Sequence, residues 1–377
     1  MIDPAPFAGA SGKGQVVVVR TRAANARGHG GVTLETMARR IAALLGYAYA
    51  GDHDPAVNHA GPLYFVPDDT LLHADAARLG IRTEDSLFGG VVPYPFVATK
   101  SLSHPALEPT SAVPEGWSHG LAARFADAVL PGYSVFTADD AHRACERILQ
   151  LGDARLKPAL GIGGTAQSVV TSHGECDAAL ARIDDAQLRQ FGVAIELNLI
   201  DTVTYSIGQS KLAGQEIAYH GTQRLTSNHA GEQVYGGSEL CIVRGGFDVL
   251  LQPDLPAPIQ CAIRQARRYD EAVEQTFPGF FASRRNYDVI RGRDRAGNWH
   301  CGVLEQSWRI GGASPAEIAA FEVFRADPTL TSVQASTHEV YSLQPPPPHA
   351  HVYFRGEDER VGPLTKYSEI RVHGNPA

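Results

Sequence analysis

Short apolar runs and amphipathic segments alternate at the start of the chain. The β-branched run 15–20 (QVVVVR) predicts a buried strand. A glycine-rich turn at 28–31 leads into segment 34–45, whose apolar side chains recur on one helical face. Segment 63–66 predicts a second strand and segment 70–79 a second helix. This order of strands and helices is typical of an α/β domain.

The middle of the chain carries elements with clear boundaries. Thr137, which is followed by acidic residues, predicts the start of a helix, and Gly152 follows its last turn. Segment 155–157 predicts a strand that Pro158 ends, and segment 193–199 predicts another strand. Helices and strands are therefore expected to pack together in this part of the chain as well.

The remainder of the chain is rich in predicted strands, from 202–207 to a terminal strand at 352–354. A helix is predicted over about 258–273. A second helix is predicted at 314–317 (SPAE), which has the form of a capping box with proline at the first helical position. We expect a β-rich domain with a few covering helices.

The length of 377 residues favours two or three domains. Hydrophobic residues make up 44% of the chain and charged residues 20%, so each domain has enough apolar material for a core. A stretch rich in proline and glycine at 107–116 is a candidate linker. We therefore expect a first domain up to roughly residue 115.

Charge and cysteine content narrow the class of protein. The net charge of -8 argues against a nucleic-acid partner, which would require a basic face for phosphates. The five cysteines are widely spaced and contain no CxxC pair, which fits reduced thiols in a cytosolic enzyme better than a disulfide framework or a zinc site. There is neither a signal-peptide pattern nor a run of 18 apolar residues, so we expect a cytoplasmic protein without a membrane partner.

The first stretch with recognisable chemistry is 155–165 (RLKPALGIGGT). It combines a strand that carries Lys157 with a loop that contains Gly161, Gly163 and Gly164. The amides of such a loop can form a nest for phosphate oxygens, and the lysine adds a positive charge from one side. A plain turn is the alternative interpretation. The loop is not a Walker A motif, because no GKS or GKT ends it.

The second stretch is a predicted hairpin of strands 285–291 and 300–306. With a turn apex at residues 296–297, Asp288 lies directly opposite Glu305. Facing carboxylates destabilise a sheet and raise one pKa, and a divalent cation between them removes both penalties. Ligation by oxygen alone suits Mg²⁺. The alternative is two independent surface acids.

The third stretch, 305–312 (EQSWRIGG), runs from that hairpin into the helix predicted at 314. An arginine and glycines before a helix N-terminus form a natural anion site. Arg309 is therefore a candidate catalytic residue. A surface salt bridge is the alternative role for this side chain.

Taken in order, these segments resemble the ATP-grasp superfamily, which includes D-alanine–D-alanine ligase, biotin carboxylase and glutathione synthetase. The resemblance covers about residues 95–340 and is strongest to an uncharacterised bacterial family of ATP-grasp type. It implies an α/β and α+β protein with an ATP-grasp fold. Residues 1–115 would be an N-terminal Rossmann-like substrate domain, 116–200 the N-terminal lobe with a glycine lid, and 201–377 the C-terminal lobe with the metal site.

The resemblance also assigns roles to individual residues. Lys100 and Lys157 would contact the phosphates of ATP below the lid glycines Gly161, Gly163 and Gly164. Glu196 and Leu199 would hold adenine at the hinge between the lobes, and Asp201 would bind the ribose. Magnesium would be bound by Asp288, Glu305 and Ser307, and the catalytic residues would be Arg309 and Lys157. Two residues depart from the family pattern, because Ala166 replaces the last lid glycine and Ser307 replaces an asparagine.

The family resemblance implies an ATP-dependent ligase that activates a carboxylate as an acyl phosphate. ATP and Mg²⁺ are the expected cofactors. A small-molecule carboxylate and an amine or other nucleophile are the expected partners, and a homodimer is left open. A small-molecule kinase and an ATP sensor without turnover are alternatives on the same fold. A dinucleotide-binding oxidoreductase built on 28–31 is disfavoured because the loop lacks GxGxxG.

Overall fold

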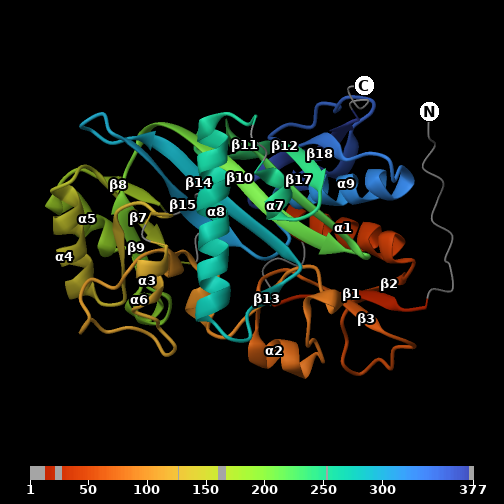
Figure 1. Cartoon of the computed structure of the whole chain (residues 1–377), viewed down its shortest axis with the longest axis horizontal. Helices are drawn as coiled ribbons and strands as arrows, with labels where there is room; N and C mark the ends of the chain where they lie inside the picture. The colour runs from red at the N-terminus through yellow and green to blue at the C-terminus, as the bar shows by residue number, and fades with distance from the viewer. Residues whose placement is uncertain (1–12, 22–27, 126, 160–166, 252–253, 373–377) are drawn as a thin grey trace.

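Four β-sheets organise the chain in the computed structural model, which describes residues 13–21, 28–125, 127–159, 167–251 and 254–372. Figure 1 shows the smallest sheets low on the right, a four-stranded sheet on the left and the largest sheet between and above them. The order of elements agrees with the α/β and α+β class expected from the sequence. The domain boundaries at 115 and 200 stay predictions.

The N-terminal sheet is parallel, with strand order β2-β1-β3. Its elements are β1 (Gln15–Val19), α1 (His29–Leu45), β2 (Ala48–Asp52) and β3 (Leu63–Pro67). Helix α1 ends where expected, because Gly46 adopts the left-handed conformation (φ 68°) and its amide bonds back to the last turn. The helix starts five residues earlier than predicted, since Gly28 is its N-cap and Gly30 and Gly31 belong to its first turn.

A second small sheet follows, with strand order β13-β5-β4. Its strands are β4 (Leu71–Leu72), β5 (Gly90–Val92) and, from later in the chain, β13 (Phe281–Ala282). The short helices of this segment are α2 (His73–Arg78), η2 (Glu84–Ser86), η3 (Pro95–Ala98) and η4 (Lys100–Ser103). The helix predicted over 70–79 is shorter than expected, because Leu71 pairs with Val91 and its segment becomes a strand.

The four-stranded sheet is antiparallel, with order β6-β9-β7-β8, and is called the small lobe below together with its helices. Its elements are α3 (Leu121–Arg124), β6 (Gly132–Val135), α4 (Ala138–Leu149), β7 (Ala154–Pro158), β8 (Ser168–Val170), α5 (His173–Leu180), α6 (Asp185–Phe191) and β9 (Val193–Leu197). The predicted N-cap is confirmed, since Thr137 Oγ1 accepts a hydrogen bond from the Asp140 amide at 3.2 Å.

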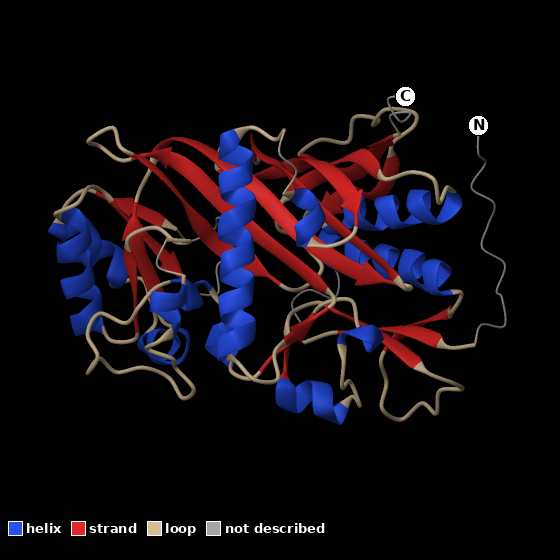
Figure 2. Cartoon of the chain, in the orientation of Figure 1, coloured by secondary structure: helices blue, strands red, loops and turns tan. Residues whose placement is uncertain are grey.

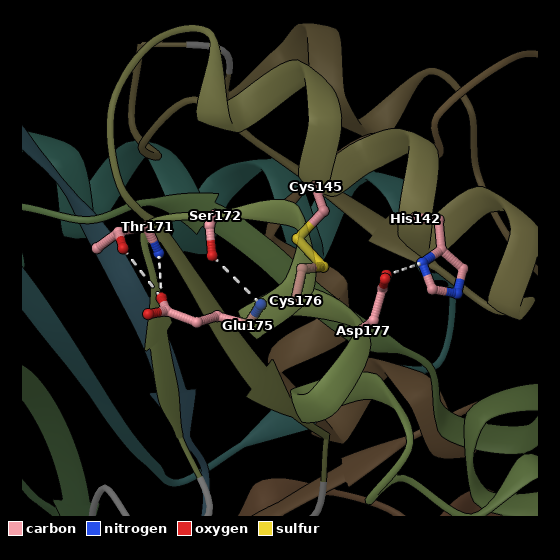
Figure 3. The surroundings of a disulfide bond; sticks show 7 residues. All are labelled: His142, Cys145, Thr171, Ser172, Glu175, Cys176 and Asp177. Atoms are coloured by element: carbon pink, nitrogen blue, oxygen red, sulfur yellow. Dashed lines mark hydrogen bonds and ion pairs between the residues drawn. A yellow bond between two sulfur atoms is a disulfide. The ribbon is translucent and has the colours of Figure 1, made fainter.

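Two of the five cysteines form a disulfide in the small lobe, which corrects the expectation of reduced thiols. Cys145 on α4 and Cys176 on α5 have Cα atoms 6.7 Å apart, and each residue is 1% exposed (Figure 3). A contact of 2.9 Å between His142 and Asp177 links the same two helices. The pairing depends on how two helices pack, and a separation of 31 residues in the sequence carries no sign of it.

We expect Cys145→Ala combined with Cys176→Ala to lower the free energy of unfolding of the small lobe by about 3 kcal/mol, because the unfolded segment gains chain entropy. Urea titration with and without a thiol reductant measures this effect. Cys241→Ala is the matched control, since this cysteine is free. Five reactive thiols in the denatured, unreduced wild-type chain would contradict the disulfide.

The largest sheet is antiparallel and has the order β15-β14-β10-β11-β12-β16-β18-β17. Its strands are β10 (Ile200–Leu212), β11 (Gln215–Ser227), β12 (Gln233–Arg244), β14 (Arg284–Arg293), β15 (Trp299–Ser307), β16 (Ser332–Val340), β17 (His351–Asp358) and β18 (Gly362–Arg371). The helices of this region are α7 (Phe247–Leu250), α8 (Ala257–Thr276) and α9 (Ser314–Ala326). The strand predicted at 352–354 is thus one part of a longer hairpin, β17–β18.

Helices cover both faces of this sheet (Figure 2). Helix α8 crosses the face that carries Ile207 and Val289, and together they form one apolar core. Helices α1 and α9 pack on the opposite face, against Leu212 and Ile217. The side chains of even-numbered residues of β10 and β14 therefore point toward the α1–α9 face. None of the helices in the described ranges is long and apolar enough to cross a membrane.

The capping box predicted at the start of α9 is wrong. The helix begins at Ser314, but no side chain caps it, and Ser314 Oγ accepts a hydrogen bond from the Gly311 amide instead. The Glu317 side chain is fully buried and pairs with Arg284 of β14 at 2.8 Å. A buried guanidinium needs a carboxylate partner, so tertiary structure overrides the local motif.

Candidate active site

The β14–β15 hairpin places Asp288 directly opposite Glu305, which confirms the predicted register. The route to that register differs from the one expected. The connecting turn has five residues, 294–298, and shifts the pairing by one position, so that Val289 faces Val303. One extra residue on β15, Leu304, restores the expected pairing. A β-bulge therefore lies immediately before Glu305.

The bulge joins the large sheet to the small lobe. The Leu304 carbonyl accepts a hydrogen bond from Lys157 Nζ at 2.8 Å. The same ammonium lies 2.8 Å from Glu196 Oε2, and Lys157 and Glu196 are 2% and 0% exposed. Lys157 comes from β7 and Glu196 from the end of β9, which are neighbouring strands. The predicted phosphate lysine and the predicted hinge glutamate are thus brought together.

His104 completes this buried group and was not predicted. Its Nε2–H donates to Glu196 Oε2 at 2.9 Å, and the residue is 1% exposed. Burial lowers the pKa of His104 and also the pKa of Lys157. Burial alone would raise the pKa of Glu196, but the Lys157 ammonium and the hydrogen bond from His104 outweigh it and hold that pKa at about 2. The only signal in the sequence is a histidine four residues after Lys100.

Lys100 supplies the second cation of the site. Its Nζ lies 3.0 Å from Glu305 Oε2, and the residue is 4% exposed. The neighbour of Glu305 fixes this arrangement, because Gln306 Nε2 donates to the carbonyls of Val97 and Thr99, both at 2.9 Å. Adjacent residues of β15 therefore hold the side chain of Lys100 and the backbone that precedes it.

Asp288 has the electrostatic signature of a cation site. Burial and the neighbouring charge of Glu305 raise the pKa of its carboxyl group to about 7. Gln223 Nε2 donates to Asp288 Oδ1 at 2.6 Å and orients the group. A divalent cation between the two carboxylates would relieve the repulsion that raises this pKa.

These two carboxylates fit a magnesium ion that is shared with a phosphate ligand. Among the described residues, no group of three or more His, Cys, Asp or Glu side chains is arranged to hold a metal. The remaining positions of an octahedral Mg²⁺ would therefore be filled by phosphate and water oxygens, as is usual for this ion. Glu196 Oε1 is a second sign of a missing ligand, since it is buried without a hydrogen-bond partner among the described residues.

The segment after Glu305 reaches the N-terminal part of the chain. Ser307, at the end of β15, lies opposite Asn286 on the same face as Glu305. Arg309 Nε lies 3.6 Å from Asp69 Oδ1, and the arginine side chain is 27% exposed. The structure thus places Arg309 between the large sheet and the segment after β3.

The remaining predicted residues lie at the hinge or outside the described part of the chain. Leu199 is 5% exposed and packs against Leu130 and Ile290. Asp201 is exposed and has a left-handed backbone (φ 51°). The lid glycines Gly161, Gly163 and Gly164, and Ala166, lie outside the described residues.

The prediction also overlooked Arg155, two residues before Lys157 on the same face of β7. Its Nε and Nη2 donate to Asn198 Oδ1 at 3.1 Å and 2.7 Å. The guanidinium therefore orients the residue between Leu197 and Leu199 at the hinge. An arginine that alternates with a lysine on one strand was the available signal.

Comparison with solved structures identifies the fold. The chain is similar to the N5-carboxyaminoimidazole ribonucleotide synthetase PurK in an ADP complex, with a TM-score of 0.51 and 11% identity over 96% of this chain and 93% of that chain. It is also similar to N5-carboxyaminoimidazole synthetase from Staphylococcus aureus complexed with ADP, with a TM-score of 0.50 and 12% identity over 96% and 94% of the two chains. A third similar structure is biotin carboxylase from Campylobacter jejuni in a β,γ-ATP complex, with a TM-score of 0.50 and 10% identity over 94% of this chain and 87% of that chain.

The chain therefore has the ATP-grasp fold, as the ordered motifs predicted. At these identities the similarity establishes the fold alone. The chain belongs to the family described as "Protein of unknown function (DUF3182)", whose model matches residues 16–368. A comparison with curated proteins gives no significant match.

Proposed function

We propose that this protein is an ATP-dependent ligase, which activates a small-molecule carboxylate as an acyl phosphate and passes the acyl group to an amine or another nucleophile. The observation that carries the proposal is the meeting of two lysines and two carboxylates where the small lobe meets the large sheet. Lys100 contacts Glu305, which faces Asp288. Lys157 contacts the carbonyl of Leu304, the residue before Glu305 on β15. The solved structures with this fold cited above are ADP and ATP complexes, which supports a nucleotide at this place.

In the first step, a carboxylate oxygen of the substrate attacks the γ-phosphorus of ATP. The bond from this phosphorus to the bridging oxygen breaks, and ADP leaves. In the second step the nucleophile attacks the acyl carbon and loses a proton, and the carbon–oxygen bond to phosphate breaks. The products are the ligated acyl compound, ADP and phosphate, so atoms and charges balance.

The chain's own groups supply binding and charge neutralisation. Lys100 and Lys157 are held by carboxylates in this structure, and both would contact phosphate oxygens of ATP. Asp288 and Glu305 would hold Mg²⁺, which when bound neutralises charge on the transferring phosphoryl group. Glu196 would accept a hydrogen bond from the adenine amino group through its unpaired Oε1.

Arg309 would bind the carboxylate that accepts the phosphoryl group. It follows Glu305 by four residues, and its guanidinium is near Asp69 and partly exposed. A cation at this position suits a carboxylate before transfer and an acyl phosphate after it. An ATP sensor would have little use for such a second anion site, which favours an enzyme.

We expect Arg309→Ala to reduce kcat/KM for the acid by about 100-fold or more, because a charge-assisted bond made in the transition state is lost. The affinity for ATP should change less than about threefold, since Arg309 is not assigned to the nucleotide. Steady-state kinetics and calorimetry measure the two quantities. Asp69→Asn is the matched control, because it removes the negative charge beside Arg309 and leaves the guanidinium in place. Equal losses in catalysis and in ATP affinity would place Arg309 on the nucleotide.

The substrate acid can be sought by thermal-shift screening of carboxylic acids with and without a non-hydrolysable ATP analogue. We expect the correct acid to raise the melting temperature only when the nucleotide is present, because the acid would bind beside the γ-phosphate. Failure of any nucleotide to stabilise the protein would contradict the proposed function.

A further inference from the structure

A buried arginine controls the space beside Ser307. Arg284 of β14 is 1% exposed, and its Nη1 donates to three oxygens of the segment that follows Glu305. These are the Ser307 carbonyl at 3.2 Å, Ser307 Oγ at 3.3 Å and the Arg309 carbonyl at 2.6 Å. The guanidinium therefore holds the main chain of 307–309 and also takes up the hydroxyl group of Ser307.

The guanidinium itself is fixed from the other side. Arg284 Nη2 and Nε donate to the carboxylate of Glu317, at 2.8 Å for the shortest contact, and Glu317 is 0% exposed. That carboxylate also accepts hydrogen bonds from the Tyr219 hydroxyl at 2.7 Å and from Ser210 Oγ at 3.0 Å. Breaking a buried pair of this kind is strongly destabilising. Arg284 therefore cannot leave Ser307 to make room for a ligand.

This arrangement bears on how many metal ions the site can hold. A magnesium ion on Ser307 Oγ would lie about 2.1 Å from that oxygen. With Arg284 Nη1 at 3.3 Å from the same oxygen, the ion would lie within roughly 5.4 Å of a guanidinium nitrogen. The guanidinium and the Ser307 hydroxyl both lie close to Gly311, because a Cβ atom built on this glycine would find Nη1, Nη2 and Ser307 Oγ all within 3.7 Å. A cation at Ser307 would thus be repelled, and a neutral hydroxyl offers it little in return.

The Asp288–Glu305 side has the opposite character. Two carboxylates face each other there, and in the described part of the chain they contact the Gln223 amide and the Lys100 ammonium. This part of the site gains from a divalent cation, whereas the Ser307 part does not. The difference follows from side chains of the same two strands, β14 and β15.

We propose that the active site holds a single Mg²⁺, on Asp288 and Glu305, and that Arg284 excludes a second ion from Ser307. The inference rests on the proposed nucleotide site. Ser307 then serves as an acceptor for Arg284, which also holds the Arg309 carbonyl. The role of magnesium ligand that the family resemblance implied for Ser307 does not fit this geometry.

Manganese titration of the full chain, saturated with a non-hydrolysable ATP analogue and followed by electron paramagnetic resonance, tests the inference. We expect one tightly bound Mn²⁺ per chain. Ser307→Ala should leave the stoichiometry unchanged and shift the Mn²⁺ affinity less than about twofold, because Ser307 is not a ligand. Asp288→Asn is the positive control and should weaken Mn²⁺ binding by about 10–100-fold.

Two bound ions in the wild-type complex, or loss of an ion in Ser307→Ala, would overturn the inference and leave the proposed function intact. Ser307→Asn is expected to bind one ion as well, since Arg284 remains; a second ion in this variant would show that the residue type at 307, and not Arg284, sets the number. Absence of bound Mn²⁺ in a wild-type complex that retains the nucleotide would instead contradict the metal site of the proposed function.

Discussion

Replacement of Glu305 by glutamine is expected to reduce ATP turnover by at least about 1000-fold. The change removes one of the two facing carboxylates that would hold the metal. A metal lowers the activation free energy of phosphoryl transfer by several kcal/mol, and a loss of about 4 kcal/mol corresponds to a 1000-fold slower reaction. Binding of metal-free nucleotide should persist, because Lys100 loses its carboxylate partner and is freed for phosphate. The rate of ADP formation, measured by steady-state kinetics, and the affinity for metal-free nucleotide, measured by calorimetry, separate the two effects.

Glu322→Gln is the control for Glu305→Gln, since it also removes a carboxylate that is paired with a buried cation, in this case Arg40, but lies on α9. Its turnover should stay within about twofold of wild type, as for other changes remote from a site. A Glu305→Gln enzyme that keeps a tenth or more of its turnover would show that this carboxylate is not a metal ligand.

Lys157→Met is expected to have the second large effect, on both nucleotide affinity and folding. Loss of a charge-assisted bond to phosphate should weaken ATP binding by about 10–100-fold. The substitution also leaves Glu196 charged and fully buried without its ammonium, which costs about 3–5 kcal/mol of stability. Calorimetry with ATP and urea denaturation measure the two consequences.

The double variant Lys157→Met with Glu196→Gln separates these two consequences. It removes the uncompensated charge, so it should be more stable than Lys157→Met alone while its ATP affinity stays low. Glu196→Gln alone is the matched single variant. If ATP affinity is unchanged in both variants that lack Lys157, this lysine is a structural link between the lobes and does not bind the nucleotide.

The parts of the site that could be predicted from the sequence are local. Asp288 and Glu305 belong to one hairpin, so their pairing follows from the turn between them, to within the one-residue shift that the bulge at Leu304 cancels. The strand that carries Lys157 could be predicted from local sequence as well, because a proline and a glycine loop follow it directly. Membership of the ATP-grasp fold followed from the order of such local pieces.

The parts that could not be predicted depend on packing between distant segments. His104 meets Glu196 from 92 residues away, and nothing in either local sequence requires the contact. The Cys145–Cys176 disulfide depends on the packing of α4 against α5. Glu317 fits a local capping pattern, but its side chain pairs with the buried Arg284 of β14 instead.

The central claim is that the protein transfers the γ-phosphoryl group of ATP to a carboxylate and then releases it as phosphate. Phosphorus-31 nuclear magnetic resonance of reaction mixtures with ATP, Mg²⁺, the acid found by thermal shift and a set of amines tests this claim most directly. We expect ADP and free phosphate, formed only when both the acid and a nucleophile are present. AMP and pyrophosphate, or a stable phosphorylated product with ADP, would contradict it.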